Sequence, residues 1–521
     1  PATTVKQSLE RPYRYAFQET KLRKGSRASV DMGDGMMVGV TITALDRKAQ
    51  TVSVKVGKKN AAALRDRIDL LPDFGVDPKP IPAAVRAMIA DQCDKGTRAV
   101  VEDLLAPNPP ALVADAPLPQ DADPVERLTK TVHLMDGTVL PVQGPPGTGK
   151  THVTARAILS LVRAGKRVGV SSNSHDAIRN VLMGCIDALG EDDIDLTVQD
   201  VTIAHKDKTG AGPLPEGYRE IIQTRTSSDP LHGSAQVVGG TAWLFAREEL
   251  EGTFDYLFVD EAGQVSLANA LAMSRSTTNL VLVGDPRQLP QVIQGSHPHP
   301  ADLSCLDWIM GDHAVLPADR GIYLDTTRRM HPRLTSYISD QFYEGTLQAH
   351  PDTANQVVEV PDLPSAGAFL VPVAHTGRAQ DCPEEIKAIR AMVDRLLTGT
   401  WTDKTGATRP IRTDDIIVVA PYNAQVNALA EALGGIRVGT VDRFQGQEAP
   451  IALISMTASS AAETSRGLDF LLSRERLNVA ISRAKALSLV FASPALVATP
   501  CDTVEQMRLV NALAALEEVE T

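Results

Sequence analysis

Residues 144–151 read Gly-Pro-Pro-Gly-Thr-Gly-Lys-Thr, directly after the apolar run Val139–Val142 and before a helical pattern. This is the strand–loop–helix setting of a phosphate-binding loop. Its glycines let backbone N–H groups face phosphate oxygens, Lys150 supplies a positive charge, and the Thr151 hydroxyl can hold Mg²⁺. The stretch therefore predicts that a nucleoside triphosphate is bound and hydrolysed. The expected nucleotide-binding residues are Gly144, Pro145, Pro146, Gly147, Thr148, Gly149, Lys150 and Thr151.

Two further polar groups follow apolar runs later in the chain. Asp260 and Glu261 end the run Tyr256–Val259. A carboxylate at the carboxyl end of a buried strand can reach a metal ion held by Thr151, and the adjacent acid can polarise the attacking water. We therefore expect Asp260 to be a metal ligand and Glu261 the catalytic base. Gln288 follows the next apolar run, where its amide can bond the γ-phosphate or the attacking water.

The arrangement of apolar runs predicts an α/β fold. Short β-rich runs alternate with helical segments from residue 139 to 283, and a second such series follows from 368 to 491. This alternation is typical of parallel sheets. Before it, Ala28–Lys58 alternates apolar and polar residues, which predicts a small antiparallel β unit, and Pro82–Leu105 reads as one or two helices. We expect domains at residues 1–118, 119–315 and 316–521.

Composition narrows the class of protein. The 521 residues carry a net charge of −12, but residues 1–60 hold twelve Lys or Arg against five acids, which weakly favours nucleic acid. Five cysteines lie far apart with no Cys-x-x-Cys pair and no nearby His, so we expect reduced thiols and no zinc or iron–sulfur centre. No apolar run approaches the ~20 residues of a membrane span, and no signal pattern begins the chain. These features predict a cytoplasmic protein without a membrane partner.

More motifs stand in a fixed order around these residues. They are Val170–His175 (VSSNSH), Gly239–Thr241 (GGT), Arg329–Pro332 (RMHP), Val419–Gln425 (VAPYNAQ), Gly439–Glu448 (GTVDRFQGQE) and Arg476–Ala484 (RLNVAISRA). With the phosphate loop and the acid pair, they resemble the class B helicases of superfamily 1. That group contains the nonsense-mediated-decay RNA helicase and the Okazaki-fragment nuclease-helicase.

The resemblance implies two tandem RecA-like P-loop domains, preceded by a small β-barrel on a helical stalk, with ATP and Mg²⁺ as cofactors. Arg329 and Arg483 are then the arginines that stabilise the γ-phosphate across a cleft, and Glu448 contacts the ribose. Gln445 links the ATP cleft to the face that binds the strand. The resemblance also implies strand contacts from Ser172, Asn173, Thr241, Pro421, Tyr422 and Thr440. Alternatives stay open, since Ser172 and Asn173 also suit a simple turn, and Tyr422 a packed core aromatic.

The chain departs from the family pattern in the residues that are expected to contact the nucleobase. Arg328 stands where many relatives have a Tyr that stacks on adenine, and Thr327 where Gln is usual. A planar guanidinium can also stack on a base, so Arg328 remains the expected base contact while the preference for ATP over other triphosphates stays open. The family's adenine-reading Gln is not evident; Gln120 lies too far upstream, and Gln143 is better explained as structural.

Together these features predict an ATP-dependent 5′→3′ translocase and helicase that acts as a monomer on single-stranded nucleic acid, with DNA favoured over RNA and a role in DNA repair or defence. The alternative is an ATP-dependent switch that binds nucleic acid without unwinding it. A metabolic P-loop kinase would leave the second α/β series and Arg483 unexplained. The stretch Phe17–Leu22 resembles bacterial fusions in which a RecB-type nuclease precedes the motor, and the start at Pro1 agrees with such an upstream domain, although a processed start would look the same. Because that nuclease's clustered acids and Lys are not found here, we expect that this chain alone does not cut.

Overall fold

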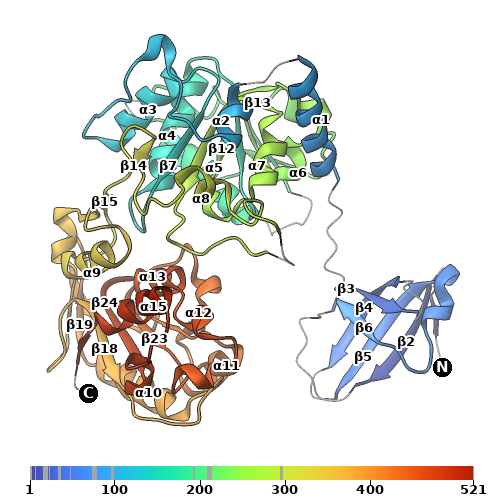
Figure 1. Cartoon of the computed structure of the whole chain (residues 1–521). Helices are drawn as coiled ribbons and strands as arrows, with labels where there is room; N and C mark the ends of the chain where they lie inside the picture. The colour runs from blue at the N-terminus through green and yellow to red at the C-terminus, as the bar shows by residue number, and fades with distance from the viewer. Residues whose placement is uncertain are drawn as a thin grey trace. The chain divides into compact units, whose positions relative to one another are not determined.

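The computed structural model describes the chain except for residues 1, 2, 6, 7, 16–21, 23, 33–36, 47, 48, 73–78, 96–98, 192, 193, 208–213, 294–296, 520 and 521. Residues 17–21 of the nuclease-like stretch therefore lie outside the described residues. The chain divides into two compact units, Pro1–Lys79 and Pro80–Thr521, each of which is described by itself (Figure 1).

The first unit is an antiparallel sheet. Its described strands are β1 (Thr3–Val5), β2 (Ser8–Arg14), β3 (Arg27–Asp31), β4 (Met37–Asp46), β5 (Thr51–Gly57) and β6 (Leu70–Pro72). They pair in the order β1-β2-β5-β4-β3-β6. Along β5, Val52, Val54 and Val56 are buried while the residues between them are partly exposed, because successive side chains of a strand point to opposite faces. The predicted antiparallel β unit is confirmed, and its closure into a barrel stays a prediction.

The second unit begins with a parallel sheet. Its strands are β7 (Val139–Gln143), β8 (Val168–Ser171), β9 (Ile203–Lys206), β10 (Ile221–Thr224), β11 (Val237–Gly239), β12 (Phe254–Val259), β13 (Thr277–Gly284) and β14 (Ile322–Tyr323). They pair in the order β10-β9-β11-β8-β12-β13-β7-β14, and every pair is parallel. Strand β7 is buried throughout, as expected for a parallel sheet covered on both faces.

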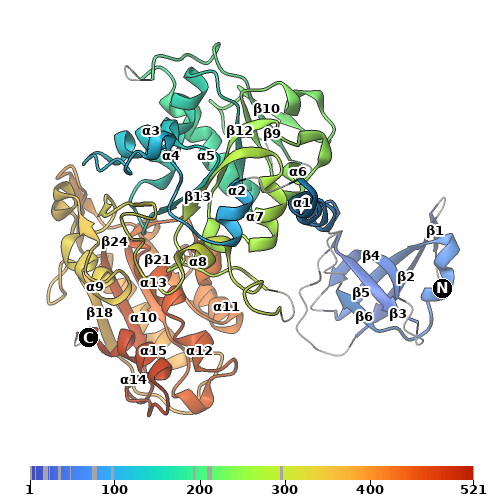
Figure 2. The same cartoon turned by 45° about the horizontal axis from the view of Figure 1, so that its top comes forward.

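Helices cover both faces of this sheet (Figure 2). One face carries α3 (Pro124–Leu134), α4 (Lys150–Arg163) and α5 (His175–Ala188); the other carries α1 (Ile81–Lys95), α2 (Ala99–Leu105), α6 (Ala242–Phe245), α7 (Leu267–Ser274) and α8 (Cys305–Met310). Tyr256 and Phe258 of β12 pack with the first set, and Leu257 and Val259 with the second. Helices α1 and α2 confirm the prediction for Pro82–Leu105, and they pack in the same core as α7.

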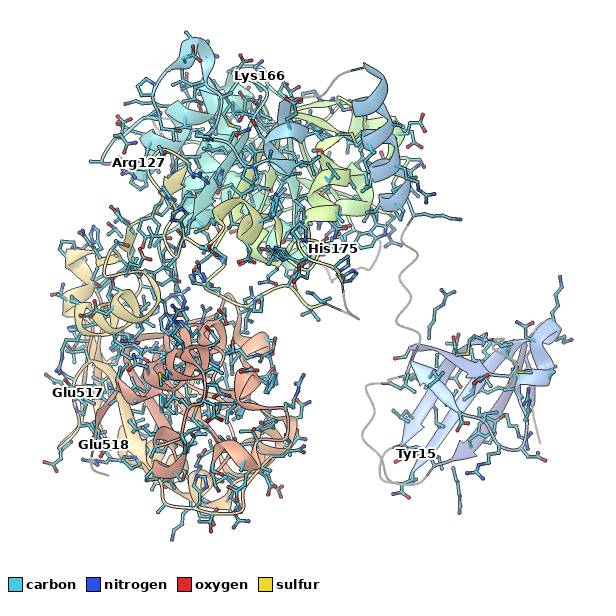
Figure 3. All side chains as sticks on the ribbon, viewed as in Figure 1. Tyr15, Arg127, Lys166, His175, Glu517 and Glu518 are labelled. Atoms are coloured by element: carbon cyan, nitrogen blue, oxygen red, sulfur yellow. The ribbon has the colours of Figure 1, made fainter. Side chains whose placement is uncertain are left out.

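A second parallel sheet follows. Its strands are β18 (Gly367–Pro372), β21 (Ile416–Val419), β22 (Arg437–Gly439), β23 (Ala449–Ser455), β24 (Ala484–Ala492) and β25 (Glu517–Glu518), in the order β22-β21-β23-β24-β18-β25. Strand β25, whose two glutamates are labelled in Figure 3, pairs in parallel with β18. Helices α10 (Pro383–Leu396) and α11 (Asn423–Ala432) pack in one core; α9 (Pro332–Phe342), α12 (Leu468–Leu471), α13 (Arg474–Ile481), α14 (Pro494–Val497) and α15 (Val504–Ala514) pack in another.

The remaining strands form two small ladders. They are β15 (Thr326–Thr327) with β16 (Gln348–Ala349), and β17 (Val357–Glu359) with β19 (Thr400–Thr402) and β20 (Thr408–Pro410). We call the sheet from β7 to β14 with its helices the first α/β domain, and the sheet from β18 to β25 with its helices the second. Two parallel α/β sheets in tandem confirm the predicted fold class, while the domain boundaries stay a prediction. Among the described residues, none of the helices combines the length and the hydropathy that a membrane crossing requires.

Candidate active site

The phosphate loop lies between β7 and α4, as its strand–loop–helix setting predicts. Gly147 (φ +77°) and Gly149 (φ +81°) adopt left-handed backbone conformations that favour glycine, and Gly149 caps the start of α4. A Cβ on Gly144 would lie 2.3 Å from Cγ of Lys150, so only glycine fits under that side chain. The Lys150 ammonium donates to the Gly144 carbonyl at 2.6 Å. This loop places its Lys and the start of a helix at one point, which suits an anion.

The acid pair lies at the end of β12, beside the loop. Asp260 is buried, and its backbone N–H donates to the Ser171 carbonyl at 2.8 Å. Burial and the neighbouring Glu261 raise the pKa of Asp260 to about 7, and the charge of Lys150 opposes that rise. Glu261 adopts a left-handed conformation (φ +53°) that turns the chain away from the strand. Two carboxyl groups crowded in a desolvated place favour a cation, so Asp260 and the half-buried Thr151 hydroxyl fit a hard divalent ion such as Mg²⁺.

Gln288 belongs to a buried hydrogen-bond network that joins the two α/β domains. Its amide donates to Oδ2 of Asp285 at 2.8 Å, and the Tyr343 hydroxyl donates to the same oxygen at 2.6 Å. The Asn478 amide on α13 donates to the Tyr343 hydroxyl at 2.9 Å and to the Arg287 carbonyl at 2.7 Å. Burial and the charge of Asp285 raise the pKa of Tyr343 well above its usual value, so the phenol stays a donor.

The segment around Arg329 lies against the phosphate loop. The Thr327 hydroxyl donates to the Pro146 carbonyl at 2.8 Å, and the backbone N–H of Arg328 donates to the Gly147 carbonyl at 2.8 Å. A Cβ on Gly147 would lie 2.4 Å from Cβ of Arg329, so the second glycine is required by this close approach. The exposed Arg328 side chain begins at the same place.

Arg329 is part of a charged group within the second domain. Its Nε donates to Glu448 at 2.7 Å and its Nη1 to the Ser482 carbonyl at 3.2 Å, while Lys485 lies 2.9 Å from the other Glu448 oxygen. Burial raises the pKa of Glu448, but the charges of Arg329 and Lys485 outweigh burial and lower it to about 2. Glu448 therefore stays ionised and fixes Arg329 beside the loop.

Arg483 is almost fully buried at the end of α13. Its Nε donates to the Val479 carbonyl at 2.9 Å and its Nη1 to the Gln447 carbonyl at 3.1 Å. Burial, and next the charge of Arg329, lower the pKa of Arg483 to about 9, while the charge of Glu261 opposes that shift. Arg483 thus lies within electrostatic reach of Arg329 and of the acid pair, held by carbonyls of its own domain.

Four of the six residues expected to contact a strand form two pairs at the carboxyl edges of the two sheets. Ser172 and Thr241 follow the neighbouring parallel strands β8 and β11, and Pro421 and Thr440 follow the neighbouring parallel strands β21 and β22. The carboxyl ends of parallel strands are where open α/β sheets bind ligands. The amide of Asn173 donates to the Gln264 carbonyl.

Tyr422 differs from the other five. It is 6% exposed, belongs to the core below the second sheet, and places its ring 5.8 Å from that of Phe470. This burial matches the alternative of a packed core aromatic. Gln143, by contrast, is structural as expected, because its amide donates to the Ala314 carbonyl at 2.9 Å and accepts from the Leu316 N–H at 2.8 Å.

The expectation that no histidine lies near a cysteine is wrong for Cys382. The ligand-type atoms of His375, Cys382 and Glu385 lie within 4.8 Å of one another, and all three residues are buried. Hydrogen bonds already occupy them, since His375 contacts Ser459 at 2.7 Å and Glu385 at 3.1 Å. Burial also raises the pKa of the Cys382 thiol to about 12, which disfavours the thiolate that a metal needs. The group is a structural network that the sequence analysis missed.

Comparisons with known proteins agree with this geometry. Two family models, each described as an AAA domain, match residues 126–299 and 304–495. The chain is 27% identical over 382 residues to the DNA replication ATP-dependent helicase/nuclease DNA2 of Bos taurus, covering 66% of this chain and 34% of that protein. It is 25% identical over 409 residues to the DNA polymerase alpha-associated DNA helicase A of Schizosaccharomyces pombe, covering 66% and 59% respectively. The chain thus spans only part of the length of these relatives.

Among solved structures, the crystal structure of Arterivirus nonstructural protein 10 (helicase) aligns with 93% of this chain and 76% of that chain, at 15% identity and a TM-score of 0.39. The two family models cover the phosphate loop, the acid pair and the Arg329 and Arg483 motifs. The family models and the relatives support a superfamily 1 helicase of the group that contains DNA2.

Proposed function

We propose that this chain is an ATP-driven translocase and helicase that moves 5′→3′ along single-stranded nucleic acid, with DNA favoured over RNA. The observation that carries the proposal is the contact between the phosphate loop and the Arg328–Arg329 segment, in which the Arg328 N–H donates to the Gly147 carbonyl at 2.8 Å. A nucleotide in this loop would touch both α/β domains, so its hydrolysis would change how the domains close.

The geometry of the site supports a chemical role for each of its residues. Lys150 and the N–H groups at the start of α4 hold the phosphates, and Glu261 orients the attacking water. Mg²⁺ held by Thr151 and Asp260 would supply positive charge to the β- and γ-phosphates. Gln288 senses the γ-phosphate, and Arg329 and Arg483 stabilise the charge that develops on it. Glu448 is the ribose contact and Arg328 the base contact.

Strand binding is assigned to the two carboxyl edges. Ser172, Asn173 and Thr241 grip the strand from the first sheet, and Pro421 and Thr440 from the second. Because these grips lie on different domains, closing and opening the nucleotide site would move one relative to the other. The names of DNA2 and DNA helicase A support DNA as the substrate. Monomeric action, a cytoplasmic location and a repair role remain parts of this proposal.

The test is the steady-state ATPase rate with and without single-stranded DNA or RNA, followed by unwinding of duplexes that carry a 5′ or a 3′ overhang. Stimulation by a strand together with unwinding from the 5′ overhang is the expected result. The better activator then identifies the nucleic acid. A strand-dependent ATPase that unwinds neither duplex would favour the ATP-dependent switch, and unwinding from the 3′ overhang would reverse the polarity.

A further inference from the structure

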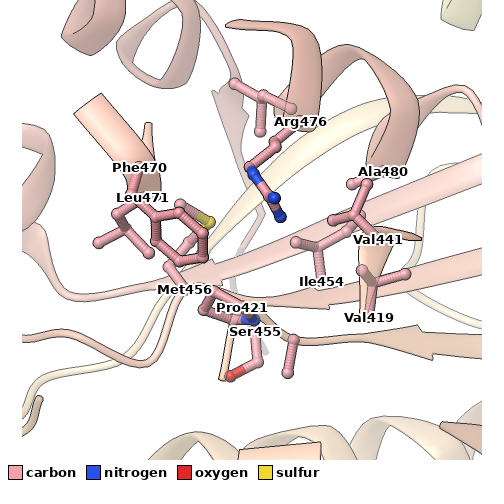
Figure 4. Close-up of a pocket in the computed structure, with 12 residues that line it drawn as sticks. Val419, Pro421, Val441, Ile454, Ser455, Met456, Phe470, Leu471, Arg476 and Ala480 are labelled. Carbon is pink, nitrogen blue, oxygen red and sulfur yellow. The ribbon is translucent and has the colours of Figure 1, made fainter. Parts of the chain in front are cut away.

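An apolar pocket opens in the second α/β domain at the carboxyl ends of β21 and β23 (Figure 4). Its walls include Pro421 after β21, Ile454 and Met456 at the end of β23, and Leu471 of α12. Phe470 and Arg476 face each other across it, with the guanidinium directed into the pocket. The pocket therefore begins beside Pro421, on the sheet edge already assigned to strand binding.

Two arginine guanidinium groups lie against the ring of Phe470. Cζ of Arg466 lies 3.9 Å from the centroid of the Phe470 ring, and Cζ of Arg476 lies 4.5 Å from it. Each contact is a cation–π interaction, so two positive charges lie beside one aromatic ring. Arg476 is partly neutralised by Asp442 at 3.3 Å. Arg466 is exposed, and among the described residues no carboxylate forms an ion pair with it.

The two guanidiniums attract an anion, and the apolar surface beside them selects what kind of anion it is. A small inorganic anion would use the charges but not the partly exposed surface of Pro421 and Phe470. A nucleotide of a single strand uses both, since its phosphodiester pairs with guanidinium groups and its base or sugar covers apolar and aromatic surface.

We propose that Arg466, Phe470 and Arg476 form a grip for one nucleotide of the single strand, in which the guanidiniums contact the phosphodiester and the Phe470 ring supports the base or sugar. This inference rests on the proposed function, because it names a further contact on the same strand. The residues assigned to strand binding at this sheet edge, Pro421 and Thr440, carry no charge. The grip adds charged contacts to them.

The experiment compares Arg466→Ala with the matched control Arg508→Ala. Arg508 is also an exposed arginine of the second domain, and it pairs with Glu505 on α15, away from the pocket lining. Binding of a fluorescent oligo-dT is titrated at several salt concentrations, together with the DNA concentration that gives half-maximal ATPase stimulation. For Arg466→Ala we expect the affinity for oligo-dT to fall about fivefold or more, and the DNA concentration for half-maximal stimulation to rise by a similar factor. The slope of log affinity against log salt should become shallower by about 0.7, which corresponds to one lost phosphate contact. Arg508→Ala keeps the wild-type slope.

Arg466→Lys and Phe470→Leu separate the two parts of the grip. The lysine variant keeps the charge and is expected to restore the salt slope, whereas the leucine variant weakens binding without changing that slope. If the wild type is stimulated by DNA but Arg466→Ala keeps its affinity and salt slope, the grip is wrong and the proposed function stands. If neither DNA nor RNA binds or stimulates the wild type, the proposed function fails and the grip fails with it.

Discussion

The hydroxyl of Tyr343 lies 2.6 Å from Oδ2 of Asp285 and donates a hydrogen bond to it, although Asp285 follows β13 of the first α/β domain and Tyr343 follows α9 of the second. The same carboxylate oxygen holds Gln288, and the same hydroxyl accepts a hydrogen bond from Asn478 on α13. Arg483 follows the end of that helix. The contact therefore connects Gln288 to the helix that precedes Arg483.

Replacing Tyr343 with Phe removes only the hydroxyl and leaves Asp285 and Asn478 short of a partner. Losing a hydrogen bond to a buried charged group costs about 1.5–3 kcal/mol. If the bond is made in the closed, hydrolysing state, kcat of the strand-stimulated ATPase should fall about tenfold while KM for ATP changes little. Steady-state kinetics at saturating DNA measures this split.

The matched control is Tyr337→Phe, because Tyr337 lies in α9 and donates its hydroxyl to the Ala512 carbonyl within the second domain. It should leave kcat near the wild-type value. An equal loss of kcat in both variants would mean that Tyr343 serves only to stabilise the second domain.

We predict different effects on nucleotide binding for substitutions in the phosphate loop and in the acid pair. Lys150→Ala should abolish hydrolysis and weaken nucleotide binding, because the ammonium is the loop's charge. Glu261→Gln keeps the shape of the side chain but loses its charge, so it should abolish hydrolysis while nucleotide binding remains largely intact. Binding of a fluorescent ATP analogue and the ATPase rate, measured on the same samples, separate the two effects. Turnover near the wild-type rate in Glu261→Gln would remove Glu261 from the role of base.

Local patterns explain why these residues could be predicted from the sequence. The loop at 144–151, the acids after β12 and the alternating valines of β5 each depend on neighbours within a few residues. Their conformations follow from strand ends, helix starts and side-chain alternation, which are local properties of the chain. Both parallel sheets could be predicted for the same reason.

The contacts that join distant segments could not be predicted. Asp285 and Tyr343 are separated by 58 positions, and nothing in either stretch indicates that they meet. The sequence left Tyr422 open between a strand contact and a packed core aromatic, and its packing against Phe470 matches the second alternative. His375 and Cys382 are close in sequence, but only the turn into α10 brings their side chains together with Glu385. In each case tertiary packing decides what the local pattern leaves open.

Substitutions of Arg483 test its role in catalysis. If it is the cross-cleft arginine, Arg483→Ala should lower kcat by about 10³-fold. Arg483→Lys keeps a charge but cannot reproduce both carbonyl contacts to Val479 and Gln447, so it should recover only a small part of that loss. Single-turnover hydrolysis measures the chemical step, and binding of the ATP analogue reports whether the nucleotide site is intact. A rate within a few-fold of wild type in Arg483→Ala would leave this guanidinium as a structural one.

Arg328 sets up a test of nucleotide selectivity. The side chain is exposed beside the phosphate loop, at the position where the family resemblance implies a Tyr. A guanidinium stacks on any base, while an aromatic ring adds about 0.5–1.5 kcal/mol of stacking that is strongest with a purine. Arg328→Tyr should therefore raise the ratio of kcat/KM for ATP over that for CTP about 2–10-fold. Competition between the four triphosphates measures the ratio, and an unchanged ratio would place the base away from residue 328.

We expect loss of the buried Glu385 side chain to lower the stability of the protein, and loss of the neighbouring Glu384 side chain to leave it nearly unchanged. Glu385 is fully buried, and its carboxylate accepts hydrogen bonds from the Thr457 N–H at 2.9 Å, from the Ser455 hydroxyl at 2.5 Å and from His375 at 3.1 Å. Glu385→Ala leaves these donors unpaired in the core, which should cost about 3 kcal/mol or more and lower the midpoint of thermal unfolding by about 5–10 °C. Glu384→Ala, one residue earlier, removes a solvent-exposed pair with Arg378 and a weak hydrogen bond from the Cys382 thiol, and it should leave the midpoint nearly unchanged. Differential scanning calorimetry of both variants checks the contrast, and equal midpoints would show that solvent or another side chain satisfies the donors once Glu385 is removed.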